Sequence, residues 1–250
     1  MNPNKVEILQ IDFPLYKKEI FNLIENVYYY ELWYLSNNHY GDKYDKYSAH
    51  FVAKFKNEIV GYLRIILLKP TNPYNLPAFE LTKCSYDNVC NFNKCEFSRL
   101  IVKNEFRKKS RIIYFLMLRA LEFTLINNYH CILVDSFIKC KYNLFDLYKS
   151  IGFETCSDIY KDTRYQHPEM SQLLVLDIPK ILFHLENDLI LNEGLRNTEP
   201  QFNKNFKRFN KLFLSKVDDS VINEYKKINK VYIYGKGKQK NYINTATIIT

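Results

Sequence analysis

The sequence predicts an α/β or α+β fold, with a mixed sheet flanked by helices and a basic C-terminal extension. Three observations favour this fold class. Short runs of β-branched and aromatic residues recur along the chain, as in buried strands. Segments with helical apolar spacing lie between them, and such alternation is typical of layered α/β and α+β folds. Positive charge is concentrated in the last fifth of the chain.

The first half begins with a predicted helix over residues 15–35, where apolar side chains recur on one face. Two apolar runs follow, at 49–55 and 59–68, with Asn57 and Glu58 as the turn between them. Together they predict a β-hairpin. The segment 70–77 contains three prolines, and we therefore expect a loop without regular structure there.

The second half predicts strands and helices in alternation. In chain order they are a strand at 95–102, a helix at 108–127, a strand at 131–134, a helix at 141–150, a strand at 172–178 and a helix at 178–195. Gly152 ends the fourth of these elements, and 197–200 has the composition of a linker.

Charge and length divide the chain in two. The 250 residues suffice for one large domain or for a domain with an appendage. Residues 203–250 contain eleven Lys or Arg and three Asp or Glu, which places +8 of the formal +9 there. We expect a domain over 1–178 and a helical, basic extension over 179–250. The extension is either a surface for an acidic partner or a solvated tail without one.

Composition also limits the protein class. Hydrophobic content of 47% supports a core, and no apolar run reaches the roughly 20 residues that span a membrane. No N-terminal leader is recognisable, so we expect a cytoplasmic protein. The six cysteines lack the paired spacing and the nearby histidine of a zinc site, which indicates reduced thiols and no metal.

Charged residues occur inside segments that otherwise have the composition of buried strands. Arg64 lies in the second strand of the hairpin, and Glu96 and Arg99 lie in the next strand. Buried charges need partners. Asp42 and Asp45, in the loop before the hairpin, are suitable ones. The pattern predicts either a polar functional site on the sheet or a structural network that closes a loop over it.

The stretch 96–153 resembles the GNAT superfamily of acyl-CoA-dependent N-acyltransferases. Its motifs are Arg107-Lys108-Lys109-Ser110-Arg111-Ile112 and Leu147-Tyr148-Lys149-Ser150-Ile151-Gly152-Phe153. The resemblance implies a mostly antiparallel sheet and donor binding by the first motif. Family members bind the diphosphate of coenzyme A there through backbone N–H groups beside small residues. Ser110 and Ile112 replace those small residues, whereas a thioester site for a pantetheine arm remains possible.

A narrower resemblance, to acyl-homoserine-lactone synthases and N-acyl amino acid synthases, covers 21–102. Its residues are Asp42-x-Tyr44-Asp45, Gly61-x-x-Arg64, Pro73-Tyr74, Phe79 and Glu96-x-Ser98-Arg99. Both groups take fatty acyl chains from acyl carrier protein, which is acidic. The resemblance therefore implies this carrier, or acyl-CoA, as co-substrate, with no bound cofactor and an amino acid as amine acceptor. A membrane surface is a further partner of the basic extension, whereas nucleic acid is not expected.

The resemblance implies a role for each residue. Glu96 is the general base, and Tyr148 protonates the leaving thiolate. The backbone N–H groups of Leu100 and Ile101 face the thioester oxygen if the strand bulges after Arg99.

The residues implied in substrate binding are Asp42, Asp45, Arg64, Phe79, Ser98 and Arg99. Arg64 and Arg99 either bind a substrate carboxylate or hold the two aspartates in place. Tyr148 is alternatively a core tyrosine, and Phe79 alternatively plain core.

We therefore expect an enzyme that transfers a fatty acyl group to the α-amine of an amino acid. Two alternatives remain open. One is an acyl-homoserine-lactone synthase that uses S-adenosylmethionine. The other is a non-catalytic module whose extension binds anionic lipid or nucleic acid, with Phe206, Phe209, Leu212 and Phe213 between basic residues.

Overall fold

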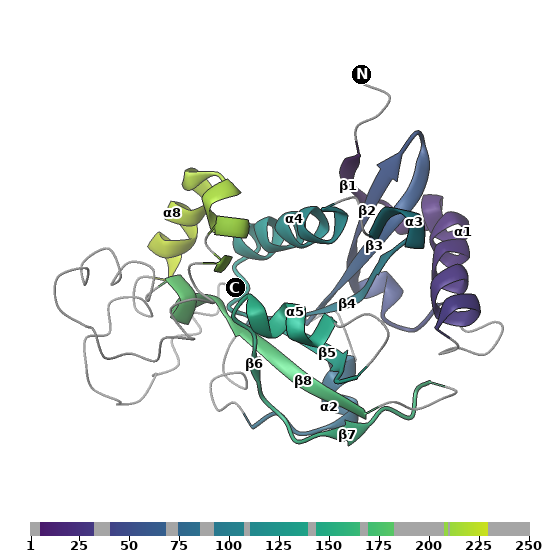
Figure 1. The fold of residues 1–250 in the computed structure, drawn as a ribbon. Helices are drawn as coiled ribbons and strands as arrows, with labels where there is room; N and C mark the ends of the chain where they lie inside the picture. The colour runs from purple at the N-terminus through teal and green to yellow at the C-terminus, as the bar shows by residue number, and fades with distance from the viewer. Residues whose placement is uncertain are drawn as a thin grey trace.

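The centre of the molecule is an eight-stranded sheet in the order β1-β2-β3-β4-β5-β8-β6, with β7 also paired to β8 (Figure 1). Among the strands that the structure describes, β4 and β5 are the one parallel pair and the other pairs are antiparallel. This confirms the predicted mixed, mostly antiparallel sheet. The computed structural model describes residues 6–32, 41–68, 75–85, 93–107, 111–139, 144–165, 170–182, 208–209 and 211–229.

The five predicted strands, which are β2, β3, β4, β5 and β8, agree with the sequence pattern to within three residues, whereas β1, β6 and β7 were not predicted. Their bounds are β1 Glu7–Ile11, β2 Ser48–Phe55, β3 Glu58–Leu67, β4 Lys94–Val102, β5 Cys131–Phe137, β6 Glu154–Thr155, β7 Tyr160–Lys161 and β8 Met170–Asp177. The turn between β2 and β3 lies one residue earlier than predicted. Lys56 and Asn57 both have positive φ, at 49° and 66°, as in the two-residue type I′ turn that suits strand twist.

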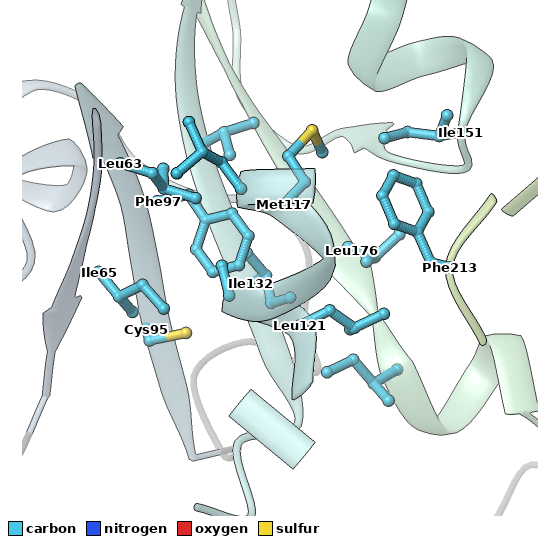
Figure 2. Close-up of a cluster of buried hydrophobic side chains, with 14 of the residues drawn as sticks. Leu63, Ile65, Cys95, Phe97, Met117, Leu121, Ile132, Ile151, Leu176 and Phe213 are labelled. Carbon is cyan, nitrogen blue, oxygen red and sulfur yellow. The ribbon is translucent and has the colours of Figure 1, made fainter. Parts of the chain in front are cut away.

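One face of the sheet packs against α4 (Ile112–Ile126) and α5 (Leu144–Ser150). Alternate side chains of β3, β4 and β5 point to this face, and Figure 2 shows Leu63, Ile65, Cys95 and Phe97 gathered against Met117 and Leu121 of α4. The residues of β4 that alternate with these, including Glu96, therefore belong to the opposite face.

The opposite face packs against α1 (Phe13–Ile24), which lies across the sheet from α4 in Figure 1. The predicted helix over 15–35 starts earlier, at Phe13, with Pro14 in its first turn, where a missing N–H is harmless. It continues as a π-helical segment, η1 (Glu25–Glu31). Residues 33–35 lie outside the described part. A short helix, α2 (Pro77–Leu81), covers the same face further along, and its first residue belongs to the predicted proline-rich loop.

The described part of the C-terminal extension packs on the domain. α8 (Asp219–Ile228) contacts α4, and the Tyr225 hydroxyl donates to the carbonyl of Tyr129 at 3.2 Å. Phe209 and Phe213 are buried in the core, and η4 (Leu214–Lys216) follows them. These two rings are therefore unavailable to a lipid or a nucleic acid, contrary to the alternative that placed them on a binding surface.

The helices of the second half agree only in part with the prediction. The helix over 108–127 is α4, preceded by a separate turn of helix, α3 (Asn104–Arg107). Residues 178–182 are helical, as expected, whereas the rest of the helix predicted to 195 and the linker at 197–200 lie outside the described residues. The domain boundary after residue 178 stays a prediction. Among the helices the structure describes, none has the length and apolar character needed to cross a bilayer.

Candidate active site

The polar residues of the predicted site lie on the sheet face opposite α4. Arg64 of β3 is paired with Ser98 of β4, so their side chains are neighbours. Glu96 is paired with Ile66 on one side and with Leu133 of β5 on the other. Strand pairing thus brings together residues that are thirty or more positions apart in the sequence.

A bulge in β4 follows Ser98. The pairs Tyr62–Ile101 and Arg64–Ser98 enclose one residue of β3 and two of β4, and Arg99 has φ 58°. This register shift is the bulge expected next to Arg99: Arg99 and Leu100 together lie opposite Leu63, and Ile101 follows them. Parallel pairing joins Lys94–Phe97 to Cys131–Val134, although β4 continues to Val102 and β5 to Phe137. The paired section therefore ends at Phe97, next to Glu96, and the region beyond it, where β4 and β5 are no longer hydrogen-bonded to each other, is here called the opening.

Two arginines and two aspartates form one wall of this opening. Arg64 Nη1 donates to Asp42 Oδ1 at 2.7 Å and to Asp45 Oδ1 at 2.5 Å. Its Nη2 donates to Ser98 Oγ at 3.0 Å. Arg99 donates to Asp42 Oδ2 at 2.9 Å and to Asp45 Oδ1 at 3.3 Å. The formal charges of these two Asp and two Arg side chains sum to zero.

The loop that carries the aspartates is ordered by its own hydrogen bonds. The N–H of Asp42 donates to Asp45 Oδ2 at 3.0 Å, and the N–H of Tyr44 donates to Asp42 Oδ1 at 2.9 Å. Burial alone would raise the pKa of Asp42, but Arg64 and Arg99 outweigh burial and lower it. Of the two predicted roles for the arginines, these contacts support holding the aspartates in place.

Glu96 is buried beside the opening, with 3% of the residue exposed. Its Oε2 accepts a hydrogen bond from the backbone N–H of Ala78 at 3.0 Å, a donor supplied by α2. Burial raises the pKa of Glu96 to about 7, although this hydrogen bond and the charges of Arg64 and Arg164 oppose the rise. A carboxyl group with a pKa near neutral pH is suited to accept and release a proton during turnover.

Two further predicted residues lie on opposite faces of the sheet, since Phe79 packs against the cluster on the Glu96 face and Tyr148 belongs to the cluster on the α4 face. Phe79 follows Ala78 in α2 and is half-buried, with Lys94 Nζ 5.5 Å from its ring centroid. Tyr148 of α5 is buried with its ring 5.1 Å from that of Phe153. Burial, and then the charge of Tyr28, raise the pKa of Tyr148, so the phenol is protonated at neutral pH. Tyr28 itself belongs to η1, on the opposite side of the sheet.

A second charged cluster lies on the other wall of the opening, and the sequence analysis missed it. Tyr160 donates its hydroxyl to Asp135 Oδ1 at 2.6 Å. Arg164 hydrogen-bonds Asp135 Oδ2 and also pairs with buried Asp162, its Nη2 at 2.6 Å from Oδ2. Asp135 directly follows the predicted strand 131–134, which was a usable signal. Arg164 lies in a segment without periodicity, where no signal existed.

The predicted donor loop is described only at its ends. Arg107 donates from Nε to the carbonyl of Val102 at 2.6 Å and binds Glu31 through both Nη atoms. Arg111 is exposed at the start of α4, and Lys108, Lys109 and Ser110 lie outside the described residues. Donor binding by these five residues stays a prediction.

Ile112, which replaces a small residue of the family loop, is the first residue of α4, and its side chain is buried in the core. Gly61 of β3 makes the space, since a Cβ there would lie 2.9 Å from Ile112 Cγ2. The substitution thus removes a small residue from the loop and fills the core. No three His, Cys, Asp or Glu residues within the described ranges are grouped so that they could hold a metal ion.

Comparison with known proteins agrees with the fold. The structure of FeeM, an N-acyl amino acid synthase from uncultured soil microbes, has a TM-score of 0.56 at 13% identity over 70% of this chain and 92% of that one. A putative N-acetyltransferase from Lactobacillus plantarum has a TM-score of 0.51 at 12% identity over 70% of this chain and 99% of that one. At such identities the likeness shows the fold alone. A search of curated proteins finds no match.

The fold and the family match together define the class: the chain is an N-acyltransferase with the GNAT fold. Residues 19–175 match the family described as N-acyl amino acid synthase FeeM, and the chain belongs to that family. The matched range contains every residue of the Asp–Arg wall and Glu96.

Proposed function

We propose that the chain transfers a fatty acyl group from acyl carrier protein to the α-amine of an amino acid, with Glu96 as general base. The observation that carries the proposal is the buried carboxyl group of Glu96, of raised pKa, next to the point where the pairing of β4 and β5 ends. Such a group is matched to proton transfer from an amine near neutral pH.

In the proposed reaction, the amine nitrogen attacks the thioester carbonyl carbon, and Glu96 accepts the N–H proton directly or through one water. The oxygen that becomes negative is stabilised by backbone N–H groups at the bulge, near Leu100 and Ile101. The C–S bond then breaks, and Tyr148 gives its proton to the thiolate. The products are an amide and the free thiol of the carrier.

The proposed donor is supported by the altered loop before α4. Ile112 is turned into the core, and Ser110 replaces the other small residue of the diphosphate loop. Coenzyme A carries a diphosphate, whereas the phosphopantetheine of a carrier protein has a single phosphate. The net positive charge after residue 203 also favours an acidic carrier. The proposed acceptor is supported by the family, whose described members are N-acyl amino acid synthases.

The decisive experiment is mass spectrometry of lipid extracts from cells that express the chain, compared with cells that express Glu96→Gln. We expect a new N-acyl amino acid that is absent from the variant, whose fold is verified by circular dichroism. A lactone with methylthioadenosine would identify the alternative synthase reaction. Equal products from both chains would remove Glu96 from the mechanism.

The donor is tested separately with purified acyl carrier protein and acyl-CoA of the same chain length. Truncation after Asn229 leaves the described packing of α8 intact and removes Lys230, Lys236, Lys238 and Lys240. If the basic end binds the carrier, this truncation raises KM for the acyl carrier protein at least several-fold and leaves KM for acyl-CoA unchanged. Loss of all turnover with both donors would contradict a docking role.

A further inference from the structure

The opening between β4 and β5 has two walls, and Asp135 is central to the second. Glu96 and Leu133 are the paired residues of β4 and β5 on this face. Ser98 and Asp135 each lie two residues further along, so both point to the same face on opposite sides of the opening. Asp135 therefore lies across from the wall that contains Arg64.

Asp135 is held in one orientation. Its Oδ1 accepts the Tyr160 hydroxyl at 2.6 Å and its Oδ2 accepts from Arg164. A carboxylate has about four acceptor positions, so each oxygen can accept one more hydrogen bond. The side chain of Asp135 is 10% exposed. The carboxylate is thus fixed by the protein and still has acceptor capacity for a ligand.

The charges of the two walls differ. The wall of Asp42, Asp45, Arg64 and Arg99 is neutral. Among the described residues, Asp135 and Asp162 share the guanidinium of Arg164. Burial raises the pKa of Asp135 to about 6, so its carboxyl group is mostly ionised near pH 7 and the cluster then carries an excess of negative charge.

Both walls lie close enough to affect groups between them. Arg164 lowers and Asp135 raises the pKa of Glu96, and the charges of Arg99, Arg64, Arg164 and Asp135 all act on Tyr28.

We propose that Asp135 binds the ammonium group of the acceptor and sets its nitrogen against Glu96. Amines are protonated near neutral pH, so the acceptor approaches as a cation and favours the wall with excess negative charge. The wall of Asp42, Asp45, Arg64 and Arg99 has no net charge and therefore does not attract a cation. Asp135 is thereby a binding and positioning residue that selects amines over uncharged analogues. The inference rests on the proposed acylation of an amino acid at this site.

The test compares two ligands that differ in the ammonium group alone. The first is the L-amino acid that the wild-type chain acylates fastest among the twenty, and the second is its α-hydroxy acid, used as a competitive inhibitor. Asp135→Asn should raise KM for the amino acid about 10- to 100-fold, the worth of a charge-assisted hydrogen bond. The inhibition constant of the hydroxy acid and KM for the donor should stay within about threefold.

A structural role for Asp135 would weaken both ligands alike, and that result would overturn the inference. So would an unchanged KM for the amino acid. If the wild-type chain acylates no amino acid, the proposed function fails first, and the two failures are thus distinguishable. Asp158→Asn is the matched control, because it removes the same charge from an exposed position two residues before Tyr160, outside the cluster of Asp135, Asp162 and Arg164. This control should change neither KM for the amino acid nor the inhibition constant of the hydroxy acid.

A second variant covers the case in which Asp135→Asn does not fold. Tyr160→Phe keeps the carboxylate but removes the hydroxyl that orients Oδ1. We expect a rise of about three- to tenfold in KM for the amino acid, with the hydroxy acid unaffected. Equal effects on the two ligands would overturn the inference here as well.

Discussion

Arg64 Nη1 lies 2.5 Å from Asp45 Oδ1, and only 3% and 10% of these two side chains are exposed. The pair joins the middle of the sheet to the loop before β2. Removing one partner of a buried ion pair leaves the other charge uncompensated, which is far more destabilising than the pair is stabilising. The contact therefore fixes the loop conformation that gives the first wall its shape.

Asp45→Asn should accordingly lower the free energy of unfolding by about 3 kcal/mol, since Arg64 and Arg99 both lose a charged partner. Urea unfolding followed by circular dichroism measures this difference. Glu58→Gln is the control, because Glu58 is 58% exposed where it pairs with Lys103. That change should stay within about 1 kcal/mol. Equal effects of the two substitutions would show that the pair is not buried in solution.

Arg99 combines a side chain that hydrogen-bonds Asp42 and Asp45 with an unfavourable backbone conformation, at φ 58°. Arg99→Gly and Arg99→Ala both remove the guanidinium, but only glycine adopts positive φ without steric cost. The glycine variant should therefore be more stable than the alanine variant, by about 1 kcal/mol in urea unfolding. Ser98 has an ordinary strand conformation, so Ser98→Ala should be more stable than Ser98→Gly. If the alanine variant were the more stable one at both positions, the bulge would be absent in solution.

Gly61 and Ile112 form a size match between β3 and α4. A Cβ on residue 61 would lie 2.9 Å from Ile112 Cγ2 and 3.2 Å from Ala53 Cβ. Gly61→Ala should thus destabilise the chain by about 1–3 kcal/mol. In the double variant with Ile112→Val the two losses should be less than additive, because the smaller side chain relieves the contact. Additive free energies of unfolding would show that the two sites do not touch.

Local patterns predicted much of the central sheet and the first wall. The strands that carry Arg64 and Glu96 were recognisable because charges interrupt otherwise apolar, β-branched runs. The bulge after Arg99 was expected from the family resemblance and not from the residues themselves. Strand β1 was missed, since its five residues mix exposed and half-buried positions without clean alternation.

The second wall was beyond sequence reasoning for a different reason. Arg164 and Asp135 are 29 residues apart, and the contact between them exists because β7 and β8 bring the chain back beside β5. The burial of Phe209 and Phe213 was also not predictable from the sequence. Aromatic side chains between lysines suit a lipid surface and a core equally well, and only packing against the domain distinguishes them.

The raised pKa of Glu96 links function to stability. The carboxyl group binds a proton more tightly in the folded chain, with a pKa of about 7 against 4.5 when unperturbed. Between these pH values the folded state holds more protons than the unfolded state, so the contribution of Glu96 becomes less favourable as pH rises. Below about pH 4.5 the penalty is absent, and above about pH 7 it is complete.

Glu96→Gln removes this ionisation and keeps an oxygen that can accept from Ala78. The variant should gain up to about 3 kcal/mol of stability over the wild-type chain near pH 8, and about 1 kcal/mol or less near pH 5. Urea unfolding of both chains at the two pH values measures the difference. The same variant should lose turnover by about 100-fold or more. A gain in stability that does not depend on pH would show that Glu96 titrates normally, and a general base at this position would then lack the pKa proposed for it.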